Sequence, residues 1–362
     1  MKSIFQYLDK KLALEYLPEE EWQQYYVFRQ LEQGIYSTDG LENSPVSIQE
    51  YFSKCTEKWT FEKFYFNYNK LCIIEPISGW ALTESNSLIP QSVWNNYMHN
   101  LKPSYLRLKL SNRNSIRVKT AIVLSYAWNN YWHFHNDIIG QLQIADEFGV
   151  DRNTPIVVNW GLQNMNYFSQ IVQESPELKD RNWLFQKPNI KIECENAHFF
   201  NTYWGHRKNF DAVLDFSRFS NNGNKYLNRR IFISRNPKRG RMILNFAQIK
   251  LILDKYGFEV VECDEMTVHQ QSELFRNASH TVGIHGAGLT NIIYRRGRPM
   301  KLLEIFSKDF SNPPYFWMCQ QYGYEYYSMV AGGSKNPADP NGNFMIDANE
   351  FEKKIATMLG GG

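Results

Sequence analysis

The stretch HTVGIHGAGLTNIIYRRG, residues 280–297, joins an apolar run to a histidine, two glycines and the beginning of a helix. Glycines carry no Cβ, so the backbone can turn tightly and a bulky or anionic ligand can approach it closely. The first amides of a helix are free donors and carry a partial positive charge. We predict an anion-binding turn here, with the candidate residues His285, Gly286, Ala287, Gly288, Leu289, Thr290 and Asn291.

A second stretch, FISRNPKRGR at residues 232–241, ends another apolar run and places Arg235, Lys238, Arg239 and Arg241 in one loop. Guanidinium groups bind phosphate oxygens through paired hydrogen bonds and stay charged. Because both loops follow strands of one expected sheet, Arg235 and Arg239 are predicted to bind a pyrophosphate. On its own, the loop also fits a solvated basic segment or a nucleic-acid contact.

A third stretch, WNNYWHFHND at residues 128–137, contains His133, His135 and Asp137. On a strand these three side chains would share a face, whereas on a helix His133 and Asp137 would share one. Imidazole and carboxylate groups suit general acid and base catalysis near neutral pH. Two alternatives stay open for this stretch: metal ligation by the three side chains, and an ordinary aromatic helix start with polar tips.

Other known motifs do not fit the glycine turn. No Gly-Lys-Ser/Thr follows it, as a P-loop requires, and the glycine spacing differs from G-x-G-x-x-G. The HGGG element of lipases and esterases is closer in letters, but it precedes a nucleophilic serine in G-x-S-x-G, and none follows Gly288. The sequence therefore disfavours a P-loop protein and a serine hydrolase.

From residue 118 onward, apolar runs alternate with helical segments, which is typical of parallel α/β layers. Strands are expected within residues 118–127, 154–160, 228–235, 258–263, 279–284 and 300–306. Helices are expected within residues 133–149, 242–257, 266–278, 289–294 and 347–359. The C-terminal half predicts a Rossmann-like domain. In the N-terminal part, PEEEWQQYYVFRQLEQG suggests a helix and KWTFEKFYFNYNKLCII suggests strands.

A chain of 362 residues exceeds the size at which one core usually stops growing, so two domains are expected. Glycine and asparagine cluster in residues 218–228, which marks a boundary. We predict an N-terminal domain over residues 1–220, in which 1–115 is poorly defined, and a C-terminal domain over 221–335. A helix and tail follow over 336–362.

Charge and cysteine content limit the partners and the compartment. A net charge of +3 and a pI of 8.4 are too mild to indicate nucleic-acid binding. The five cysteines have no metal-binding or disulfide spacing, and no apolar run is long enough to span a bilayer. These features predict a cytoplasmic protein with reduced thiols.

Taken together, the motifs resemble glycosyltransferase family 61 over roughly residues 120–330. The first motif is carried by Asn130, Tyr131, Trp132, His133, Phe134 and Asp137. The others are Ile233-Ser234-Arg235, the RMILNF segment, Gln271 before Leu274 and Phe275, HGAGLTN at 285–291, and the strand Leu302 to Ile305. The sequence departs from the family pattern at Phe246, where relatives have a glutamate.

The resemblance implies an α/β fold of the GT-B type, with two Rossmann-like domains facing a cleft and an extra N-terminal α/β region. It implies inverting transfer of a sugar from a nucleotide sugar, most simply a UDP-sugar, to a hydroxyl of a glycan or glycolipid in bacterial capsule, lipopolysaccharide or other surface polysaccharide synthesis. Peripheral membrane association is compatible with such an acceptor.

The site roles follow from the residues and the resemblance together. The chain has no D-x-D motif, so no metal or other cofactor is expected. Asp137 is the expected base, with His133 or His135 as alternative or orienting partner, and His285 is expected to act on the leaving group. Gln271 is a donor contact by resemblance, and Glu304 ends its strand where a carboxylate binds ribose hydroxyls. The rival function is a non-catalytic nucleotide- or glycan-binding module on the same scaffold.

Overall fold

The computed structural model describes residues 14–76, 78–93, 114–124, 129–216, 228–235, 240–308, 310–332 and 342–360. The chain forms two compact units: unit 1 comprises Met1–Leu31 and Glu62–Tyr203, and unit 2 comprises Glu32–Phe61 and Trp204–Gly362. These bounds differ from the expected 1–220, 221–335 and 336–362. The segment expected to mark the boundary, residues 218–228, lies outside the described residues apart from residue 228.

Unit 2 contains a five-stranded sheet in the order β12-β11-β13-β14-β15, and all neighbouring strands are parallel. The strands are β11 (Arg229–Ser234), β12 (Glu259–Glu262), β13 (Ala278–Ile284), β14 (Lys301–Phe306) and β15 (Glu325–Val330). The order changes direction between β11 and β13, the arrangement of a doubly wound sheet. Ligands of such sheets bind beyond the carboxyl ends of the strands at this change of direction.

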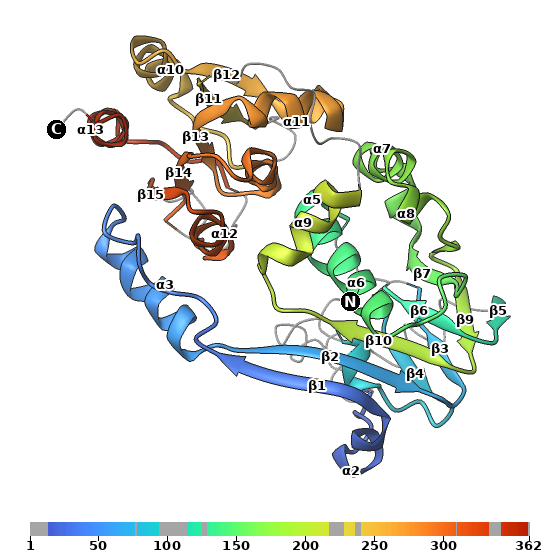
Figure 1. Cartoon of the computed structure of the whole chain (residues 1–362). Helices are drawn as coiled ribbons and strands as arrows, with labels where there is room; N and C mark the ends of the chain where they lie inside the picture. The colour runs from blue at the N-terminus through green and yellow to red at the C-terminus, as the bar shows by residue number, and fades with distance from the viewer. Residues whose placement is uncertain are drawn as a thin grey trace, which may run out of the picture. The chain divides into compact units, whose positions relative to one another are not determined.

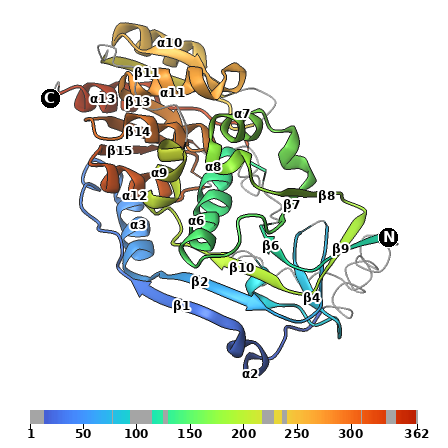
Figure 2. The ribbon, with the colours of Figure 1, turned by 45° about the vertical axis from the view of Figure 1, so that its right-hand side comes forward.

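Helices cover both faces of this sheet. They are α3 (Val46–Lys58), α9 (Arg207–Phe216), α10 (Phe246–Lys255), α11 (Val268–Arg276), α12 (Pro314–Tyr322), α13 (Ala348–Met358) and the 3₁₀ helices η7 (Cys263–Glu265) and η8 (Ala287–Arg295). The helices α10 and α13 bury their apolar residues against one face, together with Phe232, Val282 and Leu303 of the strands. Figure 2 shows α10 and α13 on one side of this sheet and α12 and α3 on the other.

The N-terminal segment Glu32–Phe61 completes the core of unit 2. Trp317 of α12 is fully buried, and its ring stacks on Tyr36 with 4.5 Å between centroids. The Trp317 indole nitrogen donates a hydrogen bond to the Thr56 hydroxyl at 2.9 Å. Phe52 of α3 packs edge-on against Phe306 of β14. The segment belongs to unit 2 because its side chains pack against α12 and β14.

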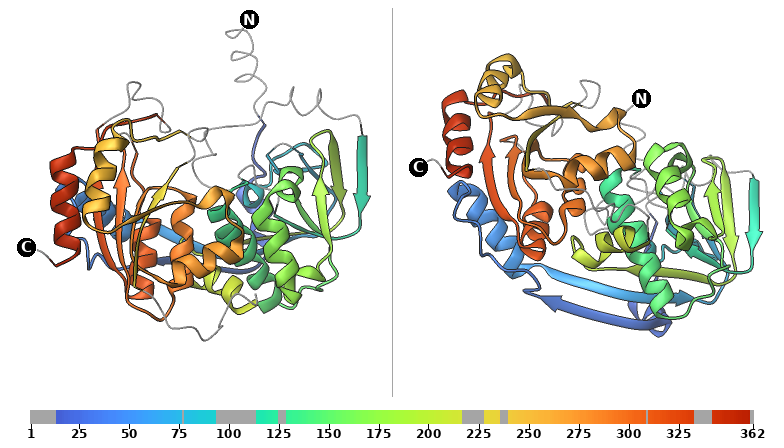
Figure 3. Two further views of the ribbon diagram at one scale, coloured as in Figure 1. Left: turned by 90° about the horizontal axis from the view of Figure 1, so that it is seen from above. Right: turned by 45° about the horizontal axis from the view of Figure 1, so that its top comes forward.

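Unit 1 contains a six-stranded mixed sheet, β1-β2-β10-β6-β7-β8, and a four-stranded sheet, β4-β3-β9-β5. The strands are β1 (Tyr26–Gln33), β2 (Thr60–Tyr68), β3 (Cys72–Ile74), β4 (Ala81–Thr83), β5 (Asn114–Val118), β6 (Ala121–Val123), β7 (Ile156–Asn159), β8 (Trp183–Gln186), β9 (Ile190–Cys194) and β10 (Ala197–Asn201). The ends of β1 and β2 continue into unit 2. Figure 3 shows β5 at the outer edge of the small sheet.

Short helices connect the strands of unit 1. They are α2 (Glu19–Trp22), α5 (Tyr131–His133), α6 (Gly140–Glu147), α7 (Asn166–Glu174) and α8 (Pro176–Lys179), the 3₁₀ helices η1 (Gln23–Tyr25), η2 (Pro90–Ser92) and η5 (Trp160–Asn164), and the π-helical turn η4 (Phe134–Ile139). Figure 1 shows α5 leading through this turn into α6. No helix in the described part of the chain has the length and apolar character needed to cross a membrane.

The mixed α/β class expected from the sequence is confirmed, and so is the alternation of strands and helices over residues 228–306. Two expected elements differ. The helix expected over residues 18–34 ends by Tyr25, and Tyr26–Gln33 forms β1 because it pairs with β2. Helix α10 begins at Phe246 rather than at residue 242, because Ile243 forms a parallel bridge with Phe344.

Candidate active site

The loops after β11 and β13 meet in unit 2, as the two basic and glycine-rich stretches predict. The strands are parallel neighbours, and Ile233 pairs with Gly283 near their carboxyl ends. The Arg235 guanidinium donates a hydrogen bond to the carbonyl oxygen of His285 at 3.0 Å. A Cβ on Gly286 would lie 2.5 Å from the Arg235 Nη1 atom, so glycine at this position lets the guanidinium approach the turn.

Arg241 reaches the same carbonyl oxygen, with its Nη1 atom 2.6 Å from the oxygen of His285. Its backbone has a φ of 56°, and burial lowers the pKa of its guanidinium. Within the described part of the chain, its Nε atom is buried without a hydrogen-bond partner. The sequence placed Arg241 in the basic loop but did not single it out. Arg239, which the sequence did single out, lies outside the described residues.

The His285 side chain is held by a buried carboxylate. A hydrogen bond of 2.5 Å joins its Nδ1 atom to Oε1 of Glu304, and the Tyr326 hydroxyl donates to Oε2 at 2.7 Å. The Glu304 side chain is 0% exposed. The expected contact between Glu304 and ribose hydroxyls does not fit this geometry, because both carboxylate oxygens are already bonded inside the unit. Glu304 instead fixes the His285 ring.

Aromatic side chains surround the His285 ring. Phe306 stacks on it at 5.3 Å, and Phe310 and Tyr315 lie 5.2 and 5.4 Å away between ring centroids. The Tyr315 hydroxyl donates to the carbonyl oxygen of Gly286 at 2.8 Å. The carbonyl groups of this turn are therefore bound by arginine and tyrosine donors. The next amides start η8, so no carbonyl of that helix accepts hydrogen bonds from the first of them.

Four of the expected donor-binding residues hold the turn internally. Leu289, Thr290 and Asn291 are buried. The Asn291 amide donates to Gln271 Oε1 at 2.7 Å, and Gln271 Nε2 donates to two carbonyl oxygens before α11. The Thr290 hydroxyl lies 3.3 Å from that of Tyr315. Gln271, Leu289, Thr290 and Asn291 thus position η8, while the backbone of 286–288 stays partly exposed.

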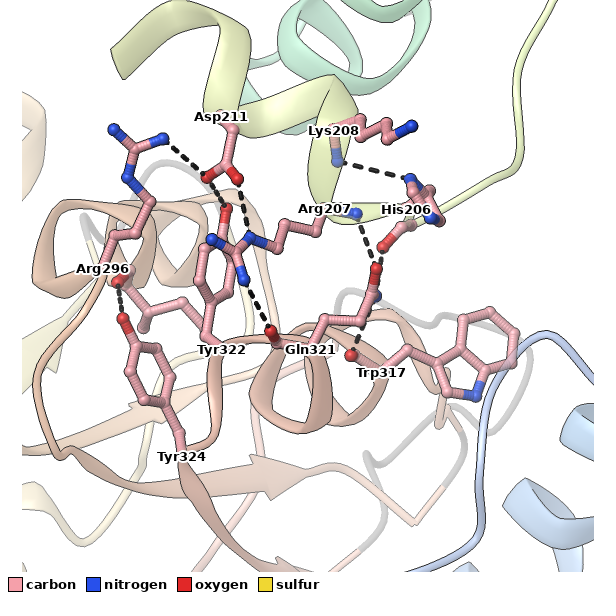
Figure 4. Close-up of polar contacts among 11 residues, drawn as sticks. His206, Arg207, Lys208, Asp211, Arg296, Trp317, Gln321, Tyr322 and Tyr324 are labelled. Carbon is pink, nitrogen blue, oxygen red and sulfur yellow. Dashed lines mark hydrogen bonds and ion pairs between the residues drawn. The ribbon is translucent and has the colours of Figure 1, made fainter. Parts of the chain in front are cut away.

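The other end of η8 is anchored by a cluster of charged and aromatic side chains (Figure 4). Asp211 of α9 accepts from the Arg207 Nε atom at 2.7 Å and from the Tyr322 hydroxyl at 2.9 Å. Arg296, which follows η8, lies 3.4 Å from the same carboxylate. The Tyr324 hydroxyl donates to a carbonyl oxygen of η8 at 3.1 Å. These contacts tie η8 to α9 and α12 and so fix the orientation of its glycine end.

In unit 1, the third stretch forms the start of the helix α5–η4–α6. The side chain of Asn130 caps this helix by accepting from the His133 amide at 3.0 Å. The residues from Phe134 to Ile139 form a π-helical turn, and such turns are frequent at functional sites. All six of these side chains are buried.

His133 and Asp137 form a pair on this helix, as helical spacing predicts. The distance between His133 Nδ1 and Asp137 Oδ2 is 2.5 Å, and Asn136 donates to the other carboxylate oxygen at 2.6 Å. The His133 side chain is 15% exposed and that of Asp137 is 3% exposed. The carboxylate therefore orients the imidazole, and the imidazole is the group that a substrate can reach.

His135 lies apart from this pair in environment. It is fully buried, and burial lowers the pKa of its imidazole to about 3. Its ring meets the Tyr131 ring edge-on at 4.6 Å. An imidazole in this setting stays neutral near pH 7 and packs within the helix start.

The remaining alternatives for this stretch concern metals and sugar stacking. The described residues contain no group of three or more His, Cys, Asp or Glu side chains that could hold a metal ion. Trp132 is buried, whereas Trp160 is half-buried with the Lys187 ammonium 5.1 Å from its ring centroid. Trp128 lies outside the described residues.

Residues 131–301 match the family model described as Glycosyltransferase 61. No curated protein matches the chain. The chain is a glycosyltransferase, an enzyme that takes a sugar donor and a glycan acceptor as its partners. The matching region, which contains both the His133–Asp137 pair and the glycine turn, is similar to glycosyltransferase family 61.

Proposed function

We propose that unit 2 binds the diphosphate of a nucleotide sugar, most simply a UDP-sugar, at the glycine turn. The observation that carries this proposal is the convergence of Arg235 and Arg241 on the carbonyl oxygen of His285, beside the first amides of η8. Two guanidiniums next to free helix amides are suited to an anion with several oxygens. The site lies at the change of strand direction, where ligands of doubly wound sheets bind.

We further propose that these groups, rather than a metal ion, stabilise the leaving diphosphate. Preorganised hydrogen-bond donors stabilise the charge that develops in a transition state without reorganisation. Arg235, Arg241, the amides at the start of η8 and the imidazole of His285 supply such donors.

For the acceptor side, in unit 1, we propose His133 as the general base and Asp137 as the group that orients it. An inverting displacement needs a base that removes the proton from the acceptor hydroxyl as the oxygen attacks the anomeric carbon. His133 is the more exposed partner of the pair, and its Nδ1 atom is bonded to the carboxylate. This ordering exchanges the roles that the sequence alone favours, in which Asp137 is the base.

A GT-B arrangement of the two units, a cytoplasmic location and an acceptor from bacterial surface polysaccharide synthesis complete the proposal. They rest on the resemblance to the family. A diphosphate site alone does not require transfer, so turnover is measured separately from binding. Hydrolysis of the donor in the absence of acceptor would support the proposal, whereas binding without turnover across a broad acceptor panel would contradict it.

The first test is a thermal-shift screen of UDP-, GDP- and CMP-sugars. A ligand at about 100 times its dissociation constant stabilises the protein by about 2.7 kcal/mol.

With the selected donor, His285→Ala is expected to lose transfer by ~10²-fold or more while the fold persists. Arg235→Ala is expected to weaken donor binding in calorimetry. Full activity of both variants would contradict the site.

Metal independence is tested by activity in EDTA. We expect turnover to survive chelation, because the arginines and helix amides neutralise the leaving group. A strict requirement for added manganese would contradict this part of the proposal and leave the diphosphate site in place.

A further inference from the structure

The His285 ring belongs to a hydrogen-bonded chain that ends in a buried tyrosine. Its Nδ1 atom is bonded to Glu304, whose other oxygen accepts from Tyr326, so the carboxylate is fully used inside the unit. Desolvation raises the pKa of the Tyr326 hydroxyl well above its usual range, so Tyr326 acts only as a donor here. The Nε2 atom of His285 makes no hydrogen bond in the described part of the chain and is not among its buried unpaired atoms. Nε2 is therefore the accessible atom of the ring.

The tautomer of the ring follows from this chain. When Glu304 is ionised, the proton between the two groups lies on Nδ1, and the Nε2 atom of a neutral imidazole is then an acceptor. A neutral His285 in this tautomer cannot donate a hydrogen bond to a phosphate oxygen. It becomes a donor at Nε2 only after it gains a second proton.

Charged and aromatic side chains surround His285 on several sides. Arg235 and Arg241 bind the carbonyl oxygen of the same residue, and Phe310 contacts both the His285 ring and the Arg241 guanidinium. Tyr315 faces the ring from α12, and Glu304 faces it from β14. The two guanidiniums and the carboxylate together carry one net positive charge. A bound dianion adds negative charge beside the ring and so favours a second proton on it.

We propose that binding of a nucleoside diphosphate is coupled to uptake of one proton at His285, and that Glu304 and Tyr326 are the positioning residues that make this uptake possible. The proton comes from solvent and lies on Nε2, where the imidazolium donates to a diphosphate oxygen. The proton therefore adds one more positive charge to the net charge of the site when the ligand binds. This inference rests on the proposed diphosphate site in unit 2.

Calorimetry with UDP at about pH 8, in buffers of different ionisation enthalpy, counts the protons taken up. UDP is the product of every UDP-sugar donor, and near this pH its terminal phosphate is ionised, since the second pKa of a phosphate is about 6. Wild-type protein is expected to take up between roughly half and one proton per UDP, and its UDP affinity is expected to fall by up to ~10-fold per pH unit above that pH.

Substitutions of Glu304 and Tyr326 test whether the proton is taken up at His285. Glu304→Gln is expected to bind UDP with almost no uptake, because an amide can hold the neutral ring with its hydrogen on Nε2. Tyr326→Phe removes a hydrogen bond to the carboxylate, so the pair binds its proton more tightly and the pH range of uptake moves upward. Tyr327→Phe is the matched control, since its hydroxyl bonds Glu325 at 3.1 Å and it should behave as wild type.

The outcomes separate the two proposals. UDP binding by wild-type protein without proton uptake overturns the coupling and keeps the diphosphate site. Uptake that persists in Glu304→Gln also overturns it, because the proton then lies elsewhere. If neither UDP nor GDP binds, the diphosphate site fails and the coupling fails with it. If Glu304→Gln does not fold, the comparison of Tyr326→Phe with Tyr327→Phe decides.

Discussion

The two units each contain a histidine whose Nδ1 atom lies 2.5 Å from a buried carboxylate, yet the pairs are built differently. His133 and Asp137 lie four residues apart on one helix, and Asn136 binds the second carboxylate oxygen. His285 directly follows β13, Glu304 lies in the neighbouring strand β14, and Tyr326 binds the second carboxylate oxygen. In both pairs the carboxylate is buried and the imidazole is the more exposed group.

The surroundings of the two pairs assign them different work. Two guanidiniums bind the carbonyl of His285, so its neighbourhood suits an anion. His133 ends the first helical turn after the Asn130 cap, and a π-helical turn of buried side chains follows it. The same contact between an imidazole and a carboxylate thus serves charge binding in one unit and is suited to proton removal in the other. The comparison shows that the pair alone does not define the role.

The largest expected effect is a loss of kcat on substitution of His133, without a change in UDP binding. His133→Gln keeps a polar side chain but removes the base, so kcat should fall by ~10² to 10⁴-fold while the dissociation constant of UDP stays unchanged. Steady-state kinetics and calorimetry measure the two quantities. His269→Gln, on the exposed face of α11, is a matched control that should keep wild-type kcat. A loss of UDP affinity equal to the loss of kcat would contradict the proposal that His133 removes a proton while the His285 site binds the anion.

The next effect separates His133 from His135, its neighbour on the helix. Burial lowers the pKa of His135 from 6.5 to about 3, so the unfolded chain binds a proton below pH 6.5 that the folded protein excludes. The stabilising contribution is complete above about pH 6.5 and is lost as the pH falls. Between pH 7 and pH 5 it amounts to about 2 kcal/mol, or ~30-fold in the unfolding equilibrium.

Urea unfolding of wild-type protein and His135→Asn at both pH values tests this. The variant should lose about 2 kcal/mol less than wild type on acidification, whatever its stability at pH 7. An equal loss in both proteins would mean that His135 is not held neutral, and His135 would return as a candidate base.

The smallest expected effect tests how closely the anion site of unit 2 depends on its glycine. In Gly286→Ala the new Cβ must push the Arg235 guanidinium away from the carbonyl oxygen of His285. UDP binding should weaken by ~10-fold, the size of one charged hydrogen bond. At Gly288 a Cβ would meet only Ile233, at 3.5 Å, so Gly288→Ala should cost less. Equal losses in both variants would argue against a specific role for Arg235.

The parts that the sequence predicts well are those set by local periodicity and by turn chemistry. Period and glycine spacing predict the strands and helices of residues 228–306 and the meeting of Arg235 with the turn. The i, i+4 spacing places His133 and Asp137 on one helical face. These features depend on neighbours in sequence or on the rule that parallel strands end at one edge of the sheet.

The parts that the sequence does not predict depend on contacts between distant segments. Glu304 looks like a ribose ligand until Tyr326, in the next strand, is seen to occupy its second oxygen. Tyr315 and Arg241 enter the site through tertiary contacts with the carbonyl groups of the turn. A polar residue in an apolar strand, such as Tyr326, is the only local signal, and it does not name its partner.

The docking of Glu32–Phe61 on the C-terminal sheet has a consequence for how the chain reaches its native state. Residues 32–61 leave the ribosome long before Trp317 is synthesised, so α3 and Tyr36 lack their packing partners during most of synthesis. Unit 2 therefore cannot complete its core until the C-terminal sheet has been synthesised, and a late folding step docks Glu32–Phe61 on that sheet. Protease protection of α3 should appear only after the full chain is released, which makes this segment a reporter of completed folding.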